Sequence, residues 1–338
     1  MELYNSTCFE CSKLITHRYS TSFSIGIKAF AKSLRAPIYA IYGFVRYADE
    51  IVDTFHGLDK VNLLADFKQQ THKAIQDRIS LNPVIHCFQT VVNQYQIPLD
   101  LIDAFFESME MDLTDQVYDQ AAYEKYIYGS AEVIGLMCLM VFCEGNKNEY
   151  EKLKPAASKL GAAFQKINFL RDIQSDFQER GRTYFPGINF LHFSNADKRA
   201  IEQDIQADFN AGLVGIQQLA SSSRLGVYIA YQYYTELFDK IKNLDLIEKA
   251  LIKIGITDTA IIKAVKANAL KESQASPIDE DMRYGTTSNS RIKAIFGARA
   301  NKYSDAELTK IKESETSMGD LMYGPESGQV GKWLGNIA

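Results

Sequence analysis

The sequence predicts an all-α protein: a bundle of helices around a central cavity, followed by a smaller helical C-terminal appendage. Up to residue 242, apolar residues recur at intervals of three and four rather than two, which is the period of an amphipathic helix. With only seven prolines in the chain, few positions interrupt such helices. Two aspartate pairs, Asp49 with Asp53 and Asp172 with Asp176, lie within apolar helical stretches. A stripe of polar side chains along an otherwise apolar helix indicates that the helix lines a cavity, and two such helices indicate a shared one.

Prolines predict several helix boundaries. Pro37 is expected to open the helix that carries the first aspartate pair, because proline is favoured in the first turn. Asn82-Pro83 and Ile97-Pro98 are expected to separate further helices, and Pro155 lies near the start of the helix that leads to the second pair. The Gly- and Pro-containing segment 181–187 is expected to break helicity just after that pair.

The character of the chain changes after residue 242. The long aromatic-rich helical stretches stop, and serine, asparagine and glycine become frequent from residue 273 onward. We therefore predict a first domain over residues 1–242 and a separate, smaller module over residues 243–338.

Composition and charge exclude several classes of protein. Hydrophobic residues make up 46% of the chain, which is enough for a packed core and excludes a disordered protein. The formal charge of −5 and the lack of a long basic run argue against a nucleic-acid partner. The N-terminus lacks a secretory pattern, and the longest apolar run, Val133–Cys143, is shorter than the ~20 residues that span a bilayer. We expect a cytoplasmic protein, with peripheral contact with the inner membrane as the alternative.

The aspartate pairs predict a site for a divalent cation. Residues four apart on a helix project from one face, so the two carboxylates of a pair repel each other unless a cation lies between them. Mg²⁺ prefers oxygen ligands and completes its shell with water and substrate phosphates. Tyr42 and Arg46 continue the stripe of the first pair, and Gln165 and Asn168 continue that of the second. We therefore predict Mg²⁺ ions that bind a diphosphate.

Each of these features also has an ordinary structural explanation. A carboxylate pair at this spacing usually lies on a solvated helix face, and Arg46 can pair with Glu50 across one turn. Serines commonly cap helices, and tyrosines commonly pack in a core.

Five segments carry a family resemblance: Ser20–Phe23, Tyr39–Asp53, Tyr128–Gly135, Gln165–Asp176 with Gly181–Pro186 behind it, and Tyr228–Tyr234. In this order and spacing they resemble the squalene/phytoene synthase family, the head-to-head prenyl transferases. The resemblance runs from about residue 10 to residue 242. It implies an isoprenoid-synthase-type helical bundle and a prenyl diphosphate substrate.

The resemblance also implies a role for each residue of the site. The catalytic residues would be Asp49, Asp53, Asp172, Asp176, Tyr42 and Tyr128, and the metal would be held by the four aspartates together with Asn168. The substrate would be bound by Ser20, Ser22, Phe23, Arg46, Gln165, Asn168, Arg182, Tyr184 and Tyr233. Arginine suits this role because it can hydrogen-bond diphosphate oxygens bidentately, while tyrosine ring faces stabilise carbocations.

The reaction implied is the Mg²⁺-dependent condensation of two geranylgeranyl diphosphates to phytoene through a cyclopropyl-carbinyl diphosphate, a step of carotenoid biosynthesis. Mn²⁺ is the alternative ion, and no NADPH is expected because this joining is not reductive. Formation of squalene or dehydrosqualene from farnesyl diphosphate is the alternative reaction. An inactive protein that binds prenyl diphosphates is the alternative of another class.

The region after Ile247 resembles part of a chitinase-like phage endolysin domain of the glycoside hydrolase family 19 type. The segments concerned are Ile262–Ser273, Tyr284–Gly297 and Asp320–Gly324, and Glu272 would match the first catalytic acid. Inverting hydrolysis needs a second carboxylate about 6.5–9.5 Å away, and we find no counterpart for it in the sequence. We therefore expect a helical appendage, with peptidoglycan hydrolysis by the tail as the alternative.

Overall fold

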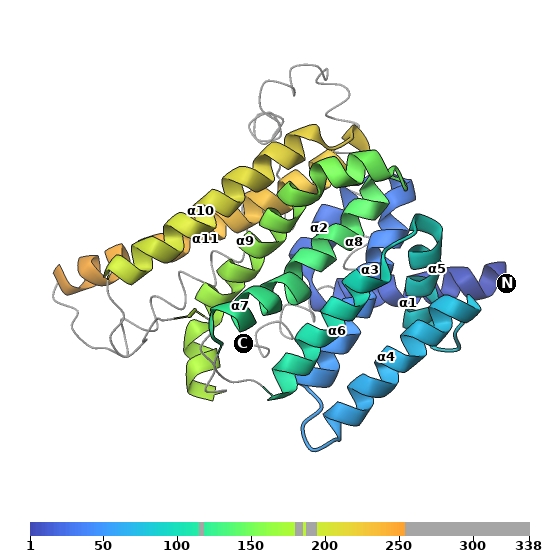
Figure 1. The fold of residues 1–338 in the computed structure, drawn as a ribbon. Helices are drawn as coiled ribbons and strands as arrows, with labels where there is room; N and C mark the ends of the chain where they lie inside the picture. The colour runs from blue at the N-terminus through green and yellow to red at the C-terminus, as the bar shows by residue number, and fades with distance from the viewer. Residues whose placement is uncertain (115–117, 180–184, 187–194, 254–338) are drawn as a thin grey trace, which may run out of the picture. The chain divides into compact units, whose positions relative to one another are not determined.

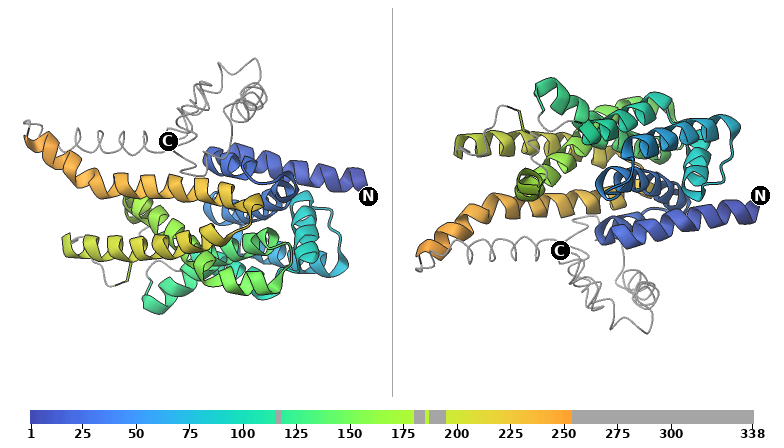
Figure 2. Two further views of the ribbon diagram at one scale, coloured as in Figure 1. Left: turned by 90° about the horizontal axis from the view of Figure 1, so that it is seen from above. Right: turned by 90° about the horizontal axis from the view of Figure 1, so that it is seen from below.

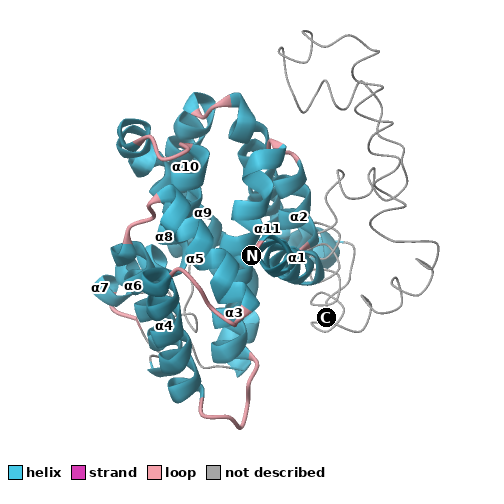
Figure 3. Cartoon of the chain, turned by 90° about the vertical axis from the view of Figure 1, so that its right-hand side faces the viewer, coloured by secondary structure: helices cyan, strands magenta, loops and turns pink. Residues whose placement is uncertain are grey.

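The computed structural model describes residues 1–114, 118–179, 185–186 and 195–253, without the side chains of 21, 22, 172–179, 195 and 243–253. Every regular element in these ranges is a helix, as Figures 1 and 3 show. The prediction of an all-α fold is therefore confirmed. Residues 254–338, and Glu272 with them, lie outside the described residues.

Figure 1 shows the arrangement of the helices. In chain order they are α1 (Glu2–Tyr19), α2 (Thr21–Lys28), α3 (Lys32–Asp53), α4 (Lys60–Asp77), α5 (Pro83–Tyr95), α6 (Leu99–Thr114), α7 (Gln120–Ile127), the π-helical turn η1 (Tyr128–Glu132), α8 (Val133–Phe142), α9 (Lys147–Glu179), α10 (Asn195–Gln218) and α11 (Ser221–Lys253).

Prolines mark some boundaries as predicted and not others. Asn82 caps α5, because its Oδ1 accepts the backbone N–H groups of Val84 and Ile85, and Pro83 opens the helix. Pro98 lies between α5 and α6, also as predicted. The prediction for Pro37 is wrong, because α3 begins at Lys32 and contains this proline. A proline near a helix start removes only one backbone hydrogen bond, which burial of the rest of the helix can offset.

An aromatic core holds α3 against α5 and α6. The fully buried Phe44 stacks on Phe88 with their ring centroids 3.7 Å apart, and its ring lies 5.5 Å from that of Phe105. Burying one such side chain contributes about 1.5–3 kcal/mol. Asp49 follows five residues later, about 140° around the helix axis. Burial of Phe44 therefore directs Asp49 to the opposite side of α3.

A close backbone approach holds α11 against α2. A Cβ atom added to Gly226 would lie 2.3 Å from the Phe30 ring and 2.6 Å from the Gly26 carbonyl oxygen. The Ala31 N–H also donates to the Ser222 carbonyl at 2.8 Å. Figure 2 shows the start of α11 at the blue N-terminal helices in both views. Glycine at 226 therefore permits α11 to pack directly on α2, the helix that Ser20 caps.

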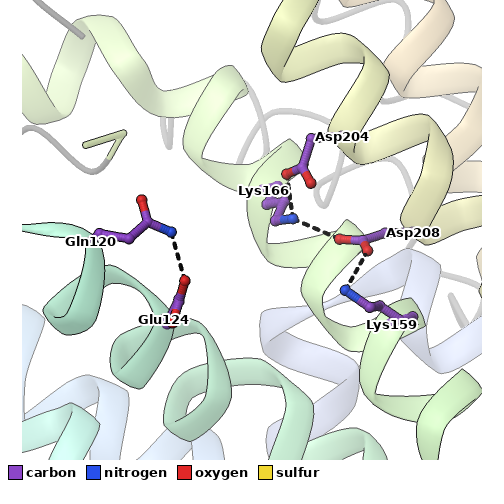
Figure 4. A network of polar contacts seen from close by, with 6 residues as sticks. All are labelled: Gln120, Glu124, Lys159, Lys166, Asp204 and Asp208. Atoms are coloured by element: carbon purple, nitrogen blue, oxygen red, sulfur yellow. Dashed lines mark hydrogen bonds and ion pairs between the residues drawn. The ribbon is translucent and has the colours of Figure 1, made fainter. Parts of the chain in front are cut away.

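A buried ion cluster joins α9 to α10 (Figure 4). The Lys166 ammonium lies 2.5 Å from Asp204 Oδ2 and 2.6 Å from Asp208 Oδ2, and Lys159 lies 3.0 Å from Asp208 Oδ1. The side chain of Lys166 is 8% exposed and that of Asp208 is 3% exposed, so this pair is desolvated. The cluster holds one side of α9 against α10, and Asn168 lies about 200° further around the axis of α9.

Among the described residues, the continuous stretch Gln120–Phe142 is long and apolar enough to cross a membrane. It comprises α7, η1 and α8. Half of its most apolar window is buried inside the fold, and the core helix of a soluble protein meets the same criterion.

Lys166→Met is expected to lower the free energy of unfolding by about 3–5 kcal/mol, because it leaves a buried carboxylate without its principal partner. Urea denaturation followed by circular dichroism measures this loss. As a control, Lys73→Met removes the exposed pair with Asp77 on α4 and is expected to leave the urea midpoint nearly unchanged. Equal midpoints for the two variants would contradict the prediction.

Candidate active site

The first aspartate motif forms one continuous group on α3. Arg46 pairs with Glu50 one turn ahead, and its Nη1 lies 3.9 Å from Asp49 Oδ2. The pair between Arg46 and Glu50, the ordinary alternative in the sequence, is thus present. Both side chains are largely buried, so this is not a pair on a solvated surface.

Asp49 is the most strongly perturbed carboxyl group of this motif. About a third of its side chain is accessible, yet burial by the surrounding protein raises its pKa to about 7. The Arg46 guanidinium opposes this rise, whereas the carboxylates of Asp53 and Asp112 add to it. A side chain that is both accessible and desolvated lies in a recess of the protein.

Asp112, in α6, brings a carboxylate that the sequence reasoning did not include. The Tyr126 hydroxyl donates to it and lies 3.0 Å from both carboxylate oxygens. The Tyr126 ring in turn lies 5.9 Å from that of Phe169 in α9, next to Asn168. No local motif marks either residue, because their importance comes from the packing of α6 and α7 against α3 and α9.

The start of α2 meets α3 at Tyr42. Ser20 caps α2 by accepting the Phe23 N–H at 3.1 Å, and its side chain lies close enough to Tyr42 to influence the pKa of that phenol. The rings of Phe23 and Tyr42 lie 5.3 Å apart. Burial raises the pKa of Tyr42 to about 12, so this residue is a neutral phenol at physiological pH.

The opposite side of the site comes from α9 and α11. The Tyr234 hydroxyl donates to Asn168 Oδ1 at 3.4 Å, and the Tyr234 ring stacks on Phe164 at 4.0 Å. Asn168 also donates to Gln165 Oε1 at 3.5 Å. Tyr234 is close enough to Tyr42 to influence its pKa. Tyr234 of α11 therefore lies between the polar stripes of α3 and α9.

The structure places Tyr128 apart from this group and Tyr233 beside Tyr234. Tyr128 is 36% exposed, and after burial its pKa is raised mainly by Asp100, at the other end of α6 from Asp112. Asp100 and Asp112 are roughly 18 Å apart along α6. Tyr233 contacts the edge of Tyr234, whose ring is the one beside Asn168. The π-helical turn η1 and the rotation of α11 decide these positions, and neither is visible in apolar periodicity. The roles assigned to both tyrosines stay predictions.

Part of the predicted site cannot be placed. The side chains of Ser22, Asp172, Asp176, Arg182 and Tyr184 lie outside the described residues, although α9 runs through positions 172 and 176. In the described part of the chain, no three His, Cys, Asp or Glu side chains lie close enough together to hold a metal ion.

The described residues nevertheless fit one half of a Mg²⁺ site. Asp49 and Asp53 supply carboxylate oxygens and Asn168 supplies an amide oxygen, which are hard ligands of the kind Mg²⁺ takes. The repulsion among carboxylates that raises the pKa of Asp49 would be relieved by a cation between them.

The fold and the site together define a class of protein. In this all-helical bundle the acidic, arginine-bearing α3 and the amide-bearing α9 lie on either side of Tyr234 of α11. The family model described as squalene/phytoene synthase matches residues 16–246, so the chain belongs to the squalene/phytoene synthase family. The protein is therefore a prenyltransferase, of the kind that condenses prenyl diphosphates head to head.

Curated relatives are about a quarter identical to this chain over the residues that align. The chloroplastic phytoene synthase 1 of Zea mays is 25% identical over 68% of this chain and 60% of its own length. The 15-cis-phytoene synthase of Synechococcus elongatus is 26% identical over 72% of this chain and 87% of its own length. The 4,4'-diapophytoene synthase of Staphylococcus haemolyticus is 22% identical over 67% of this chain and 85% of its own length.

Solved structures show the same fold. A ligand-bound dehydrosqualene synthase superposes with a TM-score of 0.62 at 19% identity, covering 80% of this chain and 96% of its own. A squalene synthase from Alicyclobacillus acidocaldarius gives a TM-score of 0.63 at 19% identity, covering 71% of this chain and 95% of its own.

Asp49→Asn is expected to stabilise the metal-free protein at pH 8 by about 1–2 kcal/mol, after allowance for partial solvation. The pKa of Asp49 rises from 3.8 to about 7 on folding, so the folded state binds this proton more tightly. The stabilisation that this proton provides is present below pH ~4 and is lost as the pH rises towards 7.

Urea unfolding in EDTA at pH 8 and at pH 4 measures this effect. The gain in the free energy of unfolding from Asp49→Asn should be present at pH 8 and absent at pH 4. The control Asp77→Asn, at an exposed carboxylate of α4, should show no such difference between the two pH values. Destabilisation by Asp49→Asn at pH 8 would show that Arg46 outweighs desolvation at this site.

Proposed function

We propose that the protein catalyses the Mg²⁺-dependent condensation of two geranylgeranyl diphosphates to phytoene. The observation that carries this proposal is the desolvated Asp49, which lies beside Asp53 and Arg46 on α3. The names of the relatives from Zea mays and Synechococcus elongatus, both phytoene synthases, support the twenty-carbon substrate.

In this proposal α3 and α9 hold the diphosphate and its counter-ions. Asp49, Asp53 and Asn168 would ligate Mg²⁺, together with Asp172 and Asp176 of the second motif, and Mn²⁺ could replace it. Bound Mg²⁺ would neutralise the leaving diphosphate and so favour ionisation of the allylic C–O bond. Arg46 would hydrogen-bond the diphosphate oxygens, and Ser20 would position both Tyr42 and the start of α2.

Aromatic and apolar side chains would control the carbocations. The Tyr42 and Tyr234 rings present π faces, which stabilise a cation by electrostatic attraction. Because the high pKa of Tyr42 keeps it neutral, its oxygen is a poor nucleophile. Phe23 and Phe164 pack on these rings and would keep water from trapping the cation.

The proposed reaction makes and breaks bonds in two stages. Ionisation of one substrate releases diphosphate, and the double bond of the second substrate attacks the allylic cation. Loss of a proton closes the cyclopropyl-carbinyl diphosphate. A second ionisation, rearrangement and loss of a proton give phytoene without a reductant, so the proposed reaction uses no NADPH.

A fifteen-carbon substrate is the second candidate. The Staphylococcus haemolyticus relative is a 4,4'-diapophytoene synthase, which supports farnesyl diphosphate as the substrate and dehydrosqualene as the product. Squalene would require a reductant in addition.

We also propose that the protein works in the cytoplasm beside a membrane. The proposed product is a hydrocarbon that partitions into lipid, so a peripheral position would ease its release. The formal charge of −5 supports the absence of a nucleic-acid partner.

The proposal is tested by incubating the protein with geranylgeranyl or farnesyl diphosphate and analysing the extracted products by chromatography. Phytoene should form with Mg²⁺ and disappear with EDTA. Asp49→Ala should lower kcat by about 100-fold or more, because it removes a ligand of the activating ion.

If the protein prefers farnesyl diphosphate, the second candidate reaction, which gives dehydrosqualene, replaces the first, which gives phytoene. Binding of either diphosphate by calorimetry without turnover would indicate an inactive binding protein and refute the proposal.

A further inference from the structure

Arg46 is held by three side chains at once, and this arrangement is more elaborate than a helix surface pair. Its guanidinium pairs with Glu50, lies near Asp49 and rests over the Tyr19 ring, 4.5 Å from the ring centroid. Tyr19 comes from the end of α1, so residues of two helices fix the position of one cation. Such fixing matters because a long arginine side chain otherwise samples many rotamers.

The contacts of Arg46 leave one donor unused. Its Nε is buried and has no hydrogen-bond partner in the described structure. A buried N–H group normally finds an acceptor, so this donor indicates a ligand that brings an oxygen to it. A diphosphate is such a ligand, and the Nε and Nη groups of arginine together bind phosphate oxygens in a fixed geometry.

Glu50 is the centre of the arrangement that holds Arg46. Its side chain is 14% exposed and accepts from Arg46, and the Thr54 and Tyr19 side chains lie close enough to lower its pKa. The pair with Arg46 occupies Oε1, an oxygen that a metal ion would otherwise use. Glu50 therefore differs from its neighbour Asp49, although both are carboxylates of the same motif.

We propose that Glu50 and Tyr19 are positioning residues, which hold the Arg46 guanidinium in place to bind the substrate diphosphate, and that Glu50 is not a ligand of the metal. This inference rests on the proposed function and adds to it a division of labour within the first motif. Asp49 and Asp53 serve the cation, whereas Glu50 serves the arginine.

The test measures binding of inorganic diphosphate by calorimetry at saturating Mg²⁺, together with the Mg²⁺ concentration at half-saturation. Glu50→Gln should weaken diphosphate binding about tenfold or more, while the Mg²⁺ midpoint stays within about twofold of the wild type. Asp53→Asn should instead raise the Mg²⁺ midpoint. Asp77→Asn serves as the control: it removes an exposed carboxylate that pairs with Lys73 one turn away on α4, and it should change neither quantity.

A double-mutant cycle shows whether Glu50 acts through Arg46. In an Arg46→Lys background, Glu50→Gln should cause no further loss of diphosphate affinity, because the forked donor has already gone. Tyr19→Phe, which keeps the ring against Arg46 but removes the hydroxyl near Glu50, should give a smaller loss of diphosphate affinity than Tyr19→Leu. Tyr19 is 50% exposed, so these two variants are expected to fold even if Glu50→Gln does not.

A rise of the Mg²⁺ midpoint in Glu50→Gln like that in Asp53→Asn would make Glu50 a metal ligand and overturn the inference. Additive losses in the cycle, or unchanged affinity in both Tyr19 variants, would overturn it as well. Wild-type protein that binds diphosphate but forms no prenyl product would refute the proposed function alone, since the binding measurements do not depend on turnover.

Discussion

The desolvation of a carboxylate on α3 is the constraint on which the site depends. Asp49 lies in a recess where its charge is poorly solvated, and neighbouring carboxylates raise its pKa further. A fold that only had to be stable would place an apolar residue there. In the proposed function the protein keeps unfavourable negative charge where a bound cation would relieve it, so that the free energy lost in the empty state would become available for binding.

Two packing contacts hold this charge in place from outside the site. The stack of Phe44 on Phe88 buries one side of α3, which leaves the other side to Asp49. On α9, Lys166 and Asp208 form a buried pair with α10, on the side away from Asn168. A buried ion pair contributes little net stability compared with a hydrophobic pair, but it defines the rotation of a helix closely. Both helices are therefore oriented by contacts remote from the chemistry.

The site also shows how one motif divides its tasks. Successive acidic residues on α3 have different neighbours: Asp49 is near the carboxylates of Asp53 and Asp112 as well as Arg46, whereas Glu50 pairs directly with Arg46. On a helix, adjacent residues point about 100° apart, so two carboxylates next to each other in sequence enter different environments. Binding of a cation and binding of an anion can thus be supported by neighbouring side chains.

The sequence by itself determined the helical fold, the family and the residues on α3, because helical periodicity and the spacing of charged residues are local properties. It also predicted Ser20, Phe23, Gln165 and Asn168 for the site; the structure places the first two beside Tyr42 and links the last two to Tyr234. Only the tertiary structure decided that Tyr234 contacts Asn168, and that Asp112 and Tyr126 stand near the first motif. Those assignments depend on how α6, α7 and α11 rotate against α3 and α9. That rotation is set by distant features, such as the π-helical turn η1 and the close approach at Gly226, which leave no periodic signal in the chain.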